Sequence, residues 1–506
     1  MLTKIITCYF PANQGILERR FIHDHCLQEI CRTELLPLPD QKPIDPPLAT
    51  RTRIPVSAWI YLFVAIITLS ESFVDVAVLK PAVAALIVLF IVLEIPSISR
   101  SQLATGFVLI CFGVTGAAIS GQWEAVLIDG VARSKSFLLL FFAVSWLQHP
   151  AGESPSLRAA RTTIVSQPPG RRYLYLSFGV HGLGSVLNLA GLSLLSSMVE
   201  GQKDPRLQRR LTVALMQGFT SASCWSPFYV GMVVILVALP TLEWRDVGPL
   251  GMGLAVIIML SGWAYDRLIV RRGSGPRNVI EPVPLARDDL GRVVGILGLL
   301  AGLVLVLVEG AGVAIPVALG IVGPPFALAW AAAMGTGPGN RIPRAKQLAH
   351  KVMGWLPTLR SEALVFVGAN VLGVGVASAI PAESVGTVVN DLIPNANLKI
   401  IAMIIGFMVC GLIGLHPVVV VIFVSAVLPP EVLGLQDWVV GLTYLGCWGL
   451  ATLISPFSAT TLFMSRVTGV PSPTIAWRWT PSPVFIGAAL IGVYVIAIRH
   501  GTLGIN

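Results

Sequence analysis

The chain has 506 residues, of which 55% are hydrophobic and only 12% are charged, and its formal net charge is +9. An ordinary soluble domain carries about twice that share of charged residues, so the composition excludes a soluble globule and predicts a polytopic membrane protein. The net charge does not indicate nucleic-acid binding, because the basic residues are concentrated in a few segments between apolar runs. The expected partner is a lipid bilayer rather than a nucleic acid.

The first 53 residues are predicted to form a cytoplasmic extension. They combine charges ("LERRFIHDH") with a proline-rich end ("LPLPDQKPIDPP"), and no cleavable signal is visible. We therefore expect a multi-pass protein of the inner (cytoplasmic) membrane with its N-terminus in the cytoplasm. The seven cysteines show no paired spacing and predict no disulfide framework.

Apolar runs of about 20 residues predict the membrane spans. They lie near 54–71, 80–97, 102–120, 124–147, 248–266, 292–311, 313–335, 360–381 and 482–499. Within the fourth run, Arg133 and Lys135 are unusual for an apolar segment. Either they pair with Asp129 about one helical turn away, or the bounds of this span differ from those predicted.

Two further regions, 173–240 and 398–466, are too long for one span and are interrupted by Gly, Pro, Ser or Asn. The charge of the flanking segments predicts how each region crosses the bilayer. Basic loops at 158–172, 203–210, 267–292 and 341–360 should face the cytoplasm. Segment 173–199 lies between two of them and is predicted to be a re-entrant hairpin with its tip at 184–188. Segment 398–428 lies between weakly acidic loops and is predicted to enter from outside, with its tip near His416-Pro417.

Each predicted hairpin precedes a segment that contains Ser-Pro-Phe: "GFTSASCWSPFYVGM" (Gly218 to Met232) and "ATLISPFSATTLFMS" (Ala451 to Ser465). Two similar halves threaded in opposite directions form an inverted repeat, an architecture of many secondary transporters. The predicted fold class is an all-α polytopic membrane protein with about eleven spans, two re-entrant hairpins and broken helices in two inverted repeats.

The predicted domain organisation places the C-terminus outside. The parts are the extension 1–53, an extra first span 54–79, a first repeat 80–266 (hairpin 173–199, broken helix 207–240), a basic cytoplasmic linker 267–291, and a second repeat 292–506 (hairpin 398–428, broken helix 437–466).

Breaks at membrane depth predict a binding site. Non-helical backbone in a bilayer leaves polar groups unpaired, at a cost of several kcal/mol each unless protein or water satisfies them. Unwound carbonyls and hydroxyls can bind a small cation, and the N-termini of half-helices can bind an anion. The alternative is that the hydroxyls bond within ordinary helices and the prolines only kink them. Two such clusters, each after a hairpin of opposite sense, favour the binding interpretation.

The pattern resembles the ion transporter superfamily, which includes divalent-anion/sodium symporters, citrate transporters, arsenite-efflux permeases and a branch of sodium/proton antiporters. "GSVLNLAGLSLLSSMV" is similar to the first hairpin of that group, "MQGFTSASCWSPF" to its first broken helix, and "GLATLISPFSATTLFMS" to its second. The resemblance covers about residues 80–500 and implies alternating access, coupling to Na⁺ or H⁺, and a homodimer by analogy. Neither tip carries the Ser-Asn-Thr triplet of the sodium-coupled members, and the two tip regions carry His181 and His416, which suggest proton carriers instead. The alternative for both histidines is helix packing by hydrogen bonds.

The resemblance implies the candidate site residues. Those expected to contact the substrate are Asn188, Thr220, Ser223, Thr452, Ser455 and Thr461. Those expected to ligate the coupling ion are Ser185, Asn188, Ser223, Ser226, His416, Ser455, Ser458 and Thr460. Asn370, in "VFVGANVLGVGV", is a further buried amide that belongs either to helix packing or to the site. No cofactor and no metal other than a bound Na⁺ is expected.

The predicted function is secondary transport of a small organic or inorganic anion, with mono- and dicarboxylates first. Few acidic residues reach the middle of the apolar runs, and cation-only antiporters usually need one there. The alternatives are a sodium/proton antiporter or an oxyanion-efflux permease and, in another class, a non-transporting membrane scaffold or receptor. No Walker loop or HExxH motif is present, so an enzyme is not expected.

Overall fold

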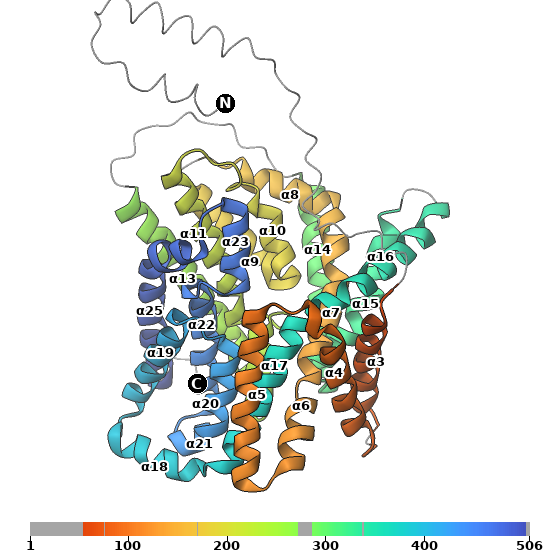
Figure 1. Cartoon of the computed structure of the whole chain (residues 1–506). Helices are drawn as coiled ribbons and strands as arrows, with labels where there is room; N and C mark the ends of the chain where they lie inside the picture. The colour runs from red at the N-terminus through yellow and green to blue at the C-terminus, as the bar shows by residue number, and fades with distance from the viewer. Residues whose placement is uncertain (1–53, 75, 169–170, 272–285, 336–337, 502–506) are drawn as a thin grey trace, which may run out of the picture. The chain divides into compact units, whose positions relative to one another are not determined.

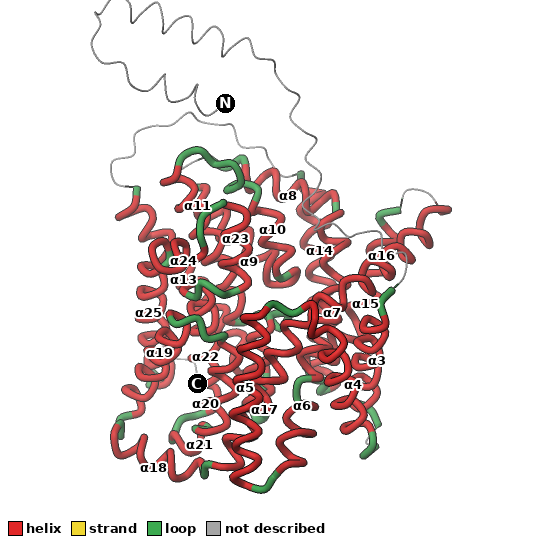
Figure 2. The backbone as a smooth tube through the Cα atoms, in the orientation of Figure 1, coloured by secondary structure: helices red, strands yellow, loops and turns green. Residues whose placement is uncertain are grey.

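The computed structural model describes residues 54–74, 76–168, 171–271, 286–335 and 338–501. Every regular element among these residues is a helix, as Figure 2 shows. The predicted extension 1–53 and most of the linker 267–291 lie outside the described residues. The all-α prediction is confirmed for the described part of the chain.

The first six described helices contain the predicted early spans. They are α3 (Val56–Glu71), α4 (Leu79–Glu94), α5 (Arg100–Ser120), α6 (Gly130–Ala132), α7 (Lys135–Glu153) and α8 (Pro155–Val165). A π-helical turn at Ala125–Asp129 precedes α6. The predicted span 124–147 is therefore divided before α7 begins.

Two groups of five helices follow the same order: a bent pair, a broken helix in two halves, and a long helix. The first group is α9 (Arg172–Leu187), α10 (Leu189–Ser196), α11 (Pro205–Ser221), α12 (Val230–Ala238) and α13 (Trp244–Tyr265). The second group is α19 (Ala396–Leu412), α20 (Pro417–Val427), α22 (Asp437–Ile454), α23 (Ala459–Thr468) and α25 (Pro481–Arg499). In the first group α9 packs on α11 and α13, and in the second α19 packs on α22 and α25. The same packing thus occurs twice.

The remaining helices connect or flank these groups. They are α14 (Arg287–Leu305), α15 (Ile315–Ala333), α16 (Arg341–Trp355), α17 (Arg360–Ala379), α18 (Ala382–Leu392), α21 (Pro430–Leu433) and α24 (Ser472–Thr474). Helix α17 runs beside α5 (Figure 1). Small residues allow this approach, since a Cβ on Gly116 would lie 2.1 Å from the carbonyl oxygen of Gly375. Close contact through small residues is typical of helix pairs in membranes.

Eight helices of the described chain are long and apolar enough to cross a membrane, and a ninth is counted if α18 and α19, bent by 108°, form one span. The structure is that of a multi-pass membrane protein. The sequence predicted about eleven spans. Part of the difference lies in α3, which is apolar but has 16 residues, and in the first broken helix, whose half α12 is short. The second broken helix is counted as one span, Asp437–Thr468. The number of spans and the inverted repeat stay predictions.

Three segments predicted as basic loops are mostly helical in the structure. Most of 158–172 belongs to α8 or α9, most of 203–210 belongs to α11, and most of 341–360 belongs to α16. Helix α16 buries Leu348, Val352 and Met353 on one face, while its basic residues occupy the rest of its surface. This is the spacing of an amphipathic helix. The prediction of loops was wrong because it used only the basic residues of these segments and overlooked the apolar residues spaced between them.

The expected pairing of Asp129 with Arg133 and Lys135 is also wrong. Asp129 pairs with Lys80 at 2.6 Å, and Lys135 pairs with Glu71 at 2.5 Å. Both partners come from helices distant in sequence, so neighbours along α6 and α7 do not compensate each other.

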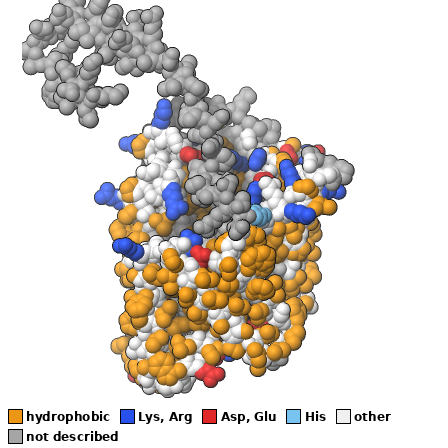
Figure 3. All heavy atoms as spheres, turned by 45° about the vertical axis from the view of Figure 1, so that its right-hand side comes forward, with side chains coloured by type: hydrophobic (Ala, Val, Ile, Leu, Met, Phe, Trp, Pro, Cys, Tyr) orange, Lys and Arg blue, Asp and Glu red, His pale blue; other side chains and the backbone are white. Residues whose placement is uncertain are grey.

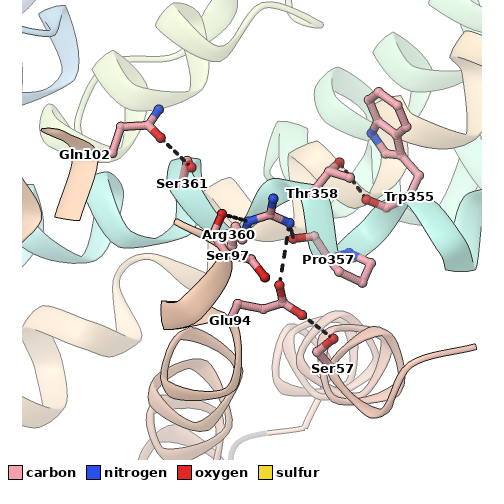
Figure 4. Close-up of polar contacts among 9 residues, drawn as sticks. All are labelled: Ser57, Glu94, Ser97, Gln102, Trp355, Pro357, Thr358, Arg360 and Ser361. Atoms are coloured by element: carbon pink, nitrogen blue, oxygen red, sulfur yellow. Dashed lines mark hydrogen bonds and ion pairs between the residues drawn. The ribbon is translucent and has the colours of Figure 1, made fainter. Parts of the chain in front are cut away.

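Polar contacts tie the ends of four helices together around Arg360 (Figure 4). Glu94, at the end of α4, accepts a hydrogen bond from Ser57 at 2.6 Å and lies 3.5 Å from the Arg360 guanidinium. Arg360 also donates to the Ser97 carbonyl at 2.9 Å, and Ser361 donates to Gln102 at the start of α5 at 2.7 Å. These contacts fix the starts of α3, α5 and α17 at the same level as the end of α4.

Candidate functional site

The two broken helices lie side by side and antiparallel. Near the start of α11, Gln208 donates to the carbonyl of Thr468 at the end of α23, at 3.0 Å. Beyond the end of α12, Thr241 donates to Asp437 at the start of α22. The order of contacts along one broken helix is therefore reversed along the other. Antiparallel placement is what two halves of opposite orientation require.

Both Ser-Pro-Phe sequences form the same turn. In the first, the Ser226 hydroxyl oxygen accepts from the backbone N–H of Phe228 at 3.2 Å. In the second, the Ser455 hydroxyl oxygen accepts from the backbone N–H of Phe457 at 3.3 Å. The serine side chain thus bonds the backbone two residues on, the local alternative to a helix that serine offers. The two copies of the motif therefore share a backbone conformation as well as a sequence.

In the second break, hydroxyls satisfy a carbonyl that proline leaves free. Pro456 has no N–H, so the carbonyl of Thr452, four residues earlier, has no helical donor. That carbonyl accepts instead from Ser458 at 2.6 Å and from Thr461 at 3.3 Å. Ser458 also accepts from the backbone N–H of Thr461 at 3.1 Å, which begins α23 as its N-cap. Ser458 and Thr461 therefore hold the backbone of the break in place.

In the first break, hydroxyls lie in the contact between the two broken helices. Ser223 donates to the carbonyl of Thr220 at 2.8 Å and lies 3.4 Å from the carbonyl of Leu445 on α22. Gly449 makes this contact close, since a Cβ there would be 2.5 Å from the Thr220 carbonyl oxygen and 2.9 Å from the Ser223 hydroxyl. Thr220 and Ser223 of the first half thus meet the middle of α22 in the second half.

The first hairpin turns at Asn188, inside the predicted tip. Asn188 has φ of 54° and is the only non-glycine residue with positive φ in the described chain. Its side-chain amide is half-buried and forms no hydrogen bond to another described residue. Just before it, the carbonyl of Ser185 accepts from the hydroxyl of Ser226, which joins the tip of the hairpin to the first break. A non-glycine residue in this backbone conformation is a signal of functional constraint.

His181 joins the first hairpin to the first break. Its Nε2 accepts from the Trp225 indole N–H at 3.0 Å, and its Nδ1 lies 2.9 Å from the Ser221 hydroxyl. Ser221 itself donates to the carbonyl of Gly218 at 2.8 Å, so Nδ1 is the protonated nitrogen and the ring is neutral. Both ring nitrogens are occupied inside the protein. This geometry favours the helix-packing alternative for His181 over a proton carrier.

His416 is placed differently. It lies at the tip of the second hairpin, where Nδ1 accepts from the backbone N–H of Val418 at 3.2 Å as the N-cap of α20. The residue is partly exposed, and its ring lies between the rings of Phe366 and Trp448, with centroids 6.4 Å and 6.1 Å away. Nε2 has no hydrogen-bond partner among the described residues, so it is the ring nitrogen left for a proton or a ligand. Of the two predicted histidines, His416 retains that capacity.

The structure brings most predicted residues to two neighbouring places along the paired broken helices. Ser185, Asn188, Thr220, Ser223 and Ser226 surround the first break, and His416, Thr452, Ser455, Ser458, Thr460 and Thr461 lie at the second break and the second hairpin tip. The two places are linked because Trp448 contacts the His416 ring and covers Gly231 at the start of α12. No group of three or more metal-ligating side chains occurs in the described residues.

Sequence reasoning missed three side chains that build this site. Trp225 and Trp448 form the contacts just described, and a signal for them was available, since each tryptophan stands in a broken segment next to small residues. The third is Asp266, which is buried and binds the Arg210 guanidinium through two contacts at 2.6 and 2.7 Å. That pair fixes α11 against the end of α13 and has no local sequence signal.

No protein-family model and no curated protein matches the sequence of this chain. Among solved structures, its fold is similar to the crystal structure of the YdaH transporter of Alcanivorax borkumensis, which is described as having an unusual topology. The TM-score is 0.50, the sequences are 13% identical, and the similarity covers 78% of this chain and 98% of that chain. At this identity the likeness shows the fold, and that fold is one used by a membrane transporter.

Proposed function

We propose that this protein is a secondary active transporter that moves a small anion, with mono- and dicarboxylates first, by alternating access. The observation that carries the proposal is the pair of antiparallel broken helices, each with the same Ser-Pro-Phe turn and each preceded by a bent helix pair. The similarity of the fold to that of a solved transporter supports it. Discontinuous helices at an interface between halves are where many transporters bind substrate and coupling ion.

An anion suits the chemistry of the two breaks. Helices α12 and α23 both begin at a break, and the first N–H groups of a helix attract negative charge. The residues at the breaks are hydroxyls, an amide and a histidine, without a carboxylate. We keep Asn188, Thr220, Ser223, Thr452, Ser455 and Thr461 as proposed substrate contacts, with the backbone role of Thr461 now added.

The coupling ion is proposed to be Na⁺ or H⁺. Carbonyl and hydroxyl oxygens at the breaks support Na⁺, while the partly exposed His416 supports H⁺. We also propose that the protein belongs to the ion transporter superfamily and forms a homodimer. We propose that it lies in the inner membrane with its N-terminus in the cytoplasm.

Transport by the purified protein in sealed proteoliposomes tests the proposal. We expect uptake of radiolabelled succinate or acetate above that of empty vesicles, driven either by a Na⁺ gradient or by a pH gradient. The double variant Ser223→Ala/Ser455→Ala should reduce uptake by about five- to thirtyfold, the effect of losing about one to two kcal/mol of binding. Ser193→Ala is the matched control, since that exposed hydroxyl bonds only the local carbonyl of Ala190.

Equal uptake by the double variant and by the control would show that the two breaks are not part of the binding site. Uptake of Na⁺ in exchange for H⁺ with no anion would favour the antiporter, and export of arsenite alone would favour the efflux permease. Absence of any flux, with no ligand raising the melting temperature, would favour the scaffold.

A further inference from the structure

A cavity of about 370 Å³ lies against helices α12 and α20, which begin at the first break and at the second hairpin tip. Its walls come from four places: Arg133 after α6, the end of α12 with Pro240, Asn370 on α17, and Ser425 on α20. Helix α17 contacts both α6 and α20, and α12 contacts α20, so these walls belong to one packed region (Figure 1). The cavity opens at the end of the broken helix that carries Thr241, which is opposite the end that carries Gln208.

Arg133 carries a charge that the described protein does not compensate. Asp129, four residues earlier, pairs with Lys80, and Glu71 pairs with Lys135, two residues after Arg133. No ion pair or side-chain hydrogen bond joins Arg133 to a described residue, and its side chain is exposed to the cavity that it lines. A guanidinium presents donors in a planar fork that fits a carboxylate or another oxyanion.

Ser425, on α20, is a second polar residue of the cavity wall. Its hydroxyl is buried near the buried hydroxyl of Tyr444, and neither hydroxyl forms a hydrogen bond of normal geometry to a described residue. Burial of such a group costs free energy unless a ligand or water satisfies it. Asn370 lies in the same cavity wall and is held rigidly, because its amide nitrogen donates to Ser134 at 3.2 Å and to the carbonyl of Phe366 at 2.8 Å. Ser134 directly follows Arg133, so this bond also fixes the backbone that carries the arginine.

The cavity is joined to the proposed transport centre by one helix. Ser425 on α20 is nine positions after His416, the N-cap of that helix, which corresponds to a rise of about 14 Å at 1.5 Å per residue. Phe366, whose carbonyl holds Asn370, also contacts the ring of His416. An anion held at Arg133 would therefore lie one short step from the tip of the second hairpin.

We propose that this cavity is an anion-recruiting site, in which Arg133, with Asn370 and Ser425 in the same cavity wall, binds a small carboxylate or oxyanion near the end of the broken helix that carries Thr241. The proposal rests on the proposed anion transport, and it assigns the first binding step. Its role is to raise the local concentration of the anion next to the centre, as a positive charge at the mouth of a cleft does.

The test uses full-length protein and measures both binding and uptake. Arg133→Gln removes the charge and retains most of the side chain, Arg133→Lys keeps the charge, and Ser425→Ala removes the buried hydroxyl. Arg245→Gln is the control, because that exposed arginine follows α12 closely and already pairs with Glu243 at 2.6 Å. It removes one positive charge without touching the Arg133 cavity.

We expect succinate and inorganic phosphate to raise the melting temperature of the wild type and of Arg245→Gln, with a smaller effect on Arg133→Gln. The concentration for half-maximal uptake should rise about tenfold or more in Arg133→Gln, with little change in maximal rate and partial recovery in Arg133→Lys. Ser425→Ala should change in the same direction by a smaller factor.

The outcomes separate this inference from the proposed function. If Ser223→Ala/Ser455→Ala lowers the maximal rate of uptake while Arg133→Gln behaves as Arg245→Gln does, the transport centre stands and the recruiting site is overturned. If Arg133→Gln alone loses binding, the site is supported and the centre is misplaced. If no anion stabilises the wild type, both proposals fail.

Discussion

At the scale of single residues, side chains in the breaks replace the backbone partners that proline removes. Pro456 leaves the carbonyl of Thr452 free, and Ser458 and Thr461 satisfy it. His181 acts in a similar way between elements, because it binds Trp225 and Ser221 at once. Buried hydrogen-bonding groups of this kind stabilise a structure mainly because leaving them unpaired costs about 1–3 kcal/mol.

This argument gives the two histidines different phenotypes. His181→Ala should lower the melting temperature of the protein, since it leaves the Trp225 indole N–H without its partner, while the pH dependence of uptake keeps its shape. His416→Gln should change the stability less and should flatten the pH dependence of uptake if H⁺ is the coupling ion. Thermal unfolding and uptake at several pH values check both. A shifted pH profile in His181→Ala would contradict the packing role.

At the scale of elements, the paired broken helices approach closely at glycine. Gly449→Ala should therefore destabilise the protein by about 1–3 kcal/mol, the usual cost of overpacking, because its Cβ would meet the Thr220 carbonyl oxygen at 2.5 Å. Gly298→Ala on α14 is the control: nothing lies within 4 Å of its Cβ, and alanine should leave stability unchanged or raise it. Thermal unfolding compares the two. Equal melting temperatures would mean that the contact between the broken helices is looser than described.

At the scale of the whole molecule, charge distinguishes the two ends. Basic residues occur along α16 and at the start of α11, while the far end carries the acidic residues Glu243 and Asp437 and, in the cavity, Arg133. Figure 3 shows Lys and Arg gathered mostly toward the upper end of the face in view, above a broad hydrophobic surface. Such asymmetry predicts that the basic end faces the cytoplasm.

Cysteine labelling of intact cells tests this orientation. In a cysteine-free background, Arg245→Cys should react with a membrane-impermeant maleimide added outside, and Arg206→Cys at the start of α11 should react only after the membrane is opened. Both positions are exposed, so access to the reagent depends on the side of the membrane. The reverse pattern would invert the predicted topology.

Local sequence patterns predicted where the helices break. They could not predict contacts between residues that are distant in the sequence. Asn188 among glycines and the two Ser-Pro-Phe motifs indicated breaks where the helices do end, because proline and glycine act on their own backbone. The partners of Asp129 could not be found in this way, since Lys80 is brought to it only by packing. The same holds for the Arg133 cavity, whose walls come from four separate parts of the chain.

The two Ser-Pro-Phe turns have one backbone pattern but opposite surroundings. Phe228 is 2% exposed, whereas its counterpart Phe457 is 67% exposed. If the proposed alternating access exchanged these two environments, Phe457 would become covered and Phe228 would become uncovered. The repeated turn would then encode both end states of the proposed cycle, with the observed structure as one of them.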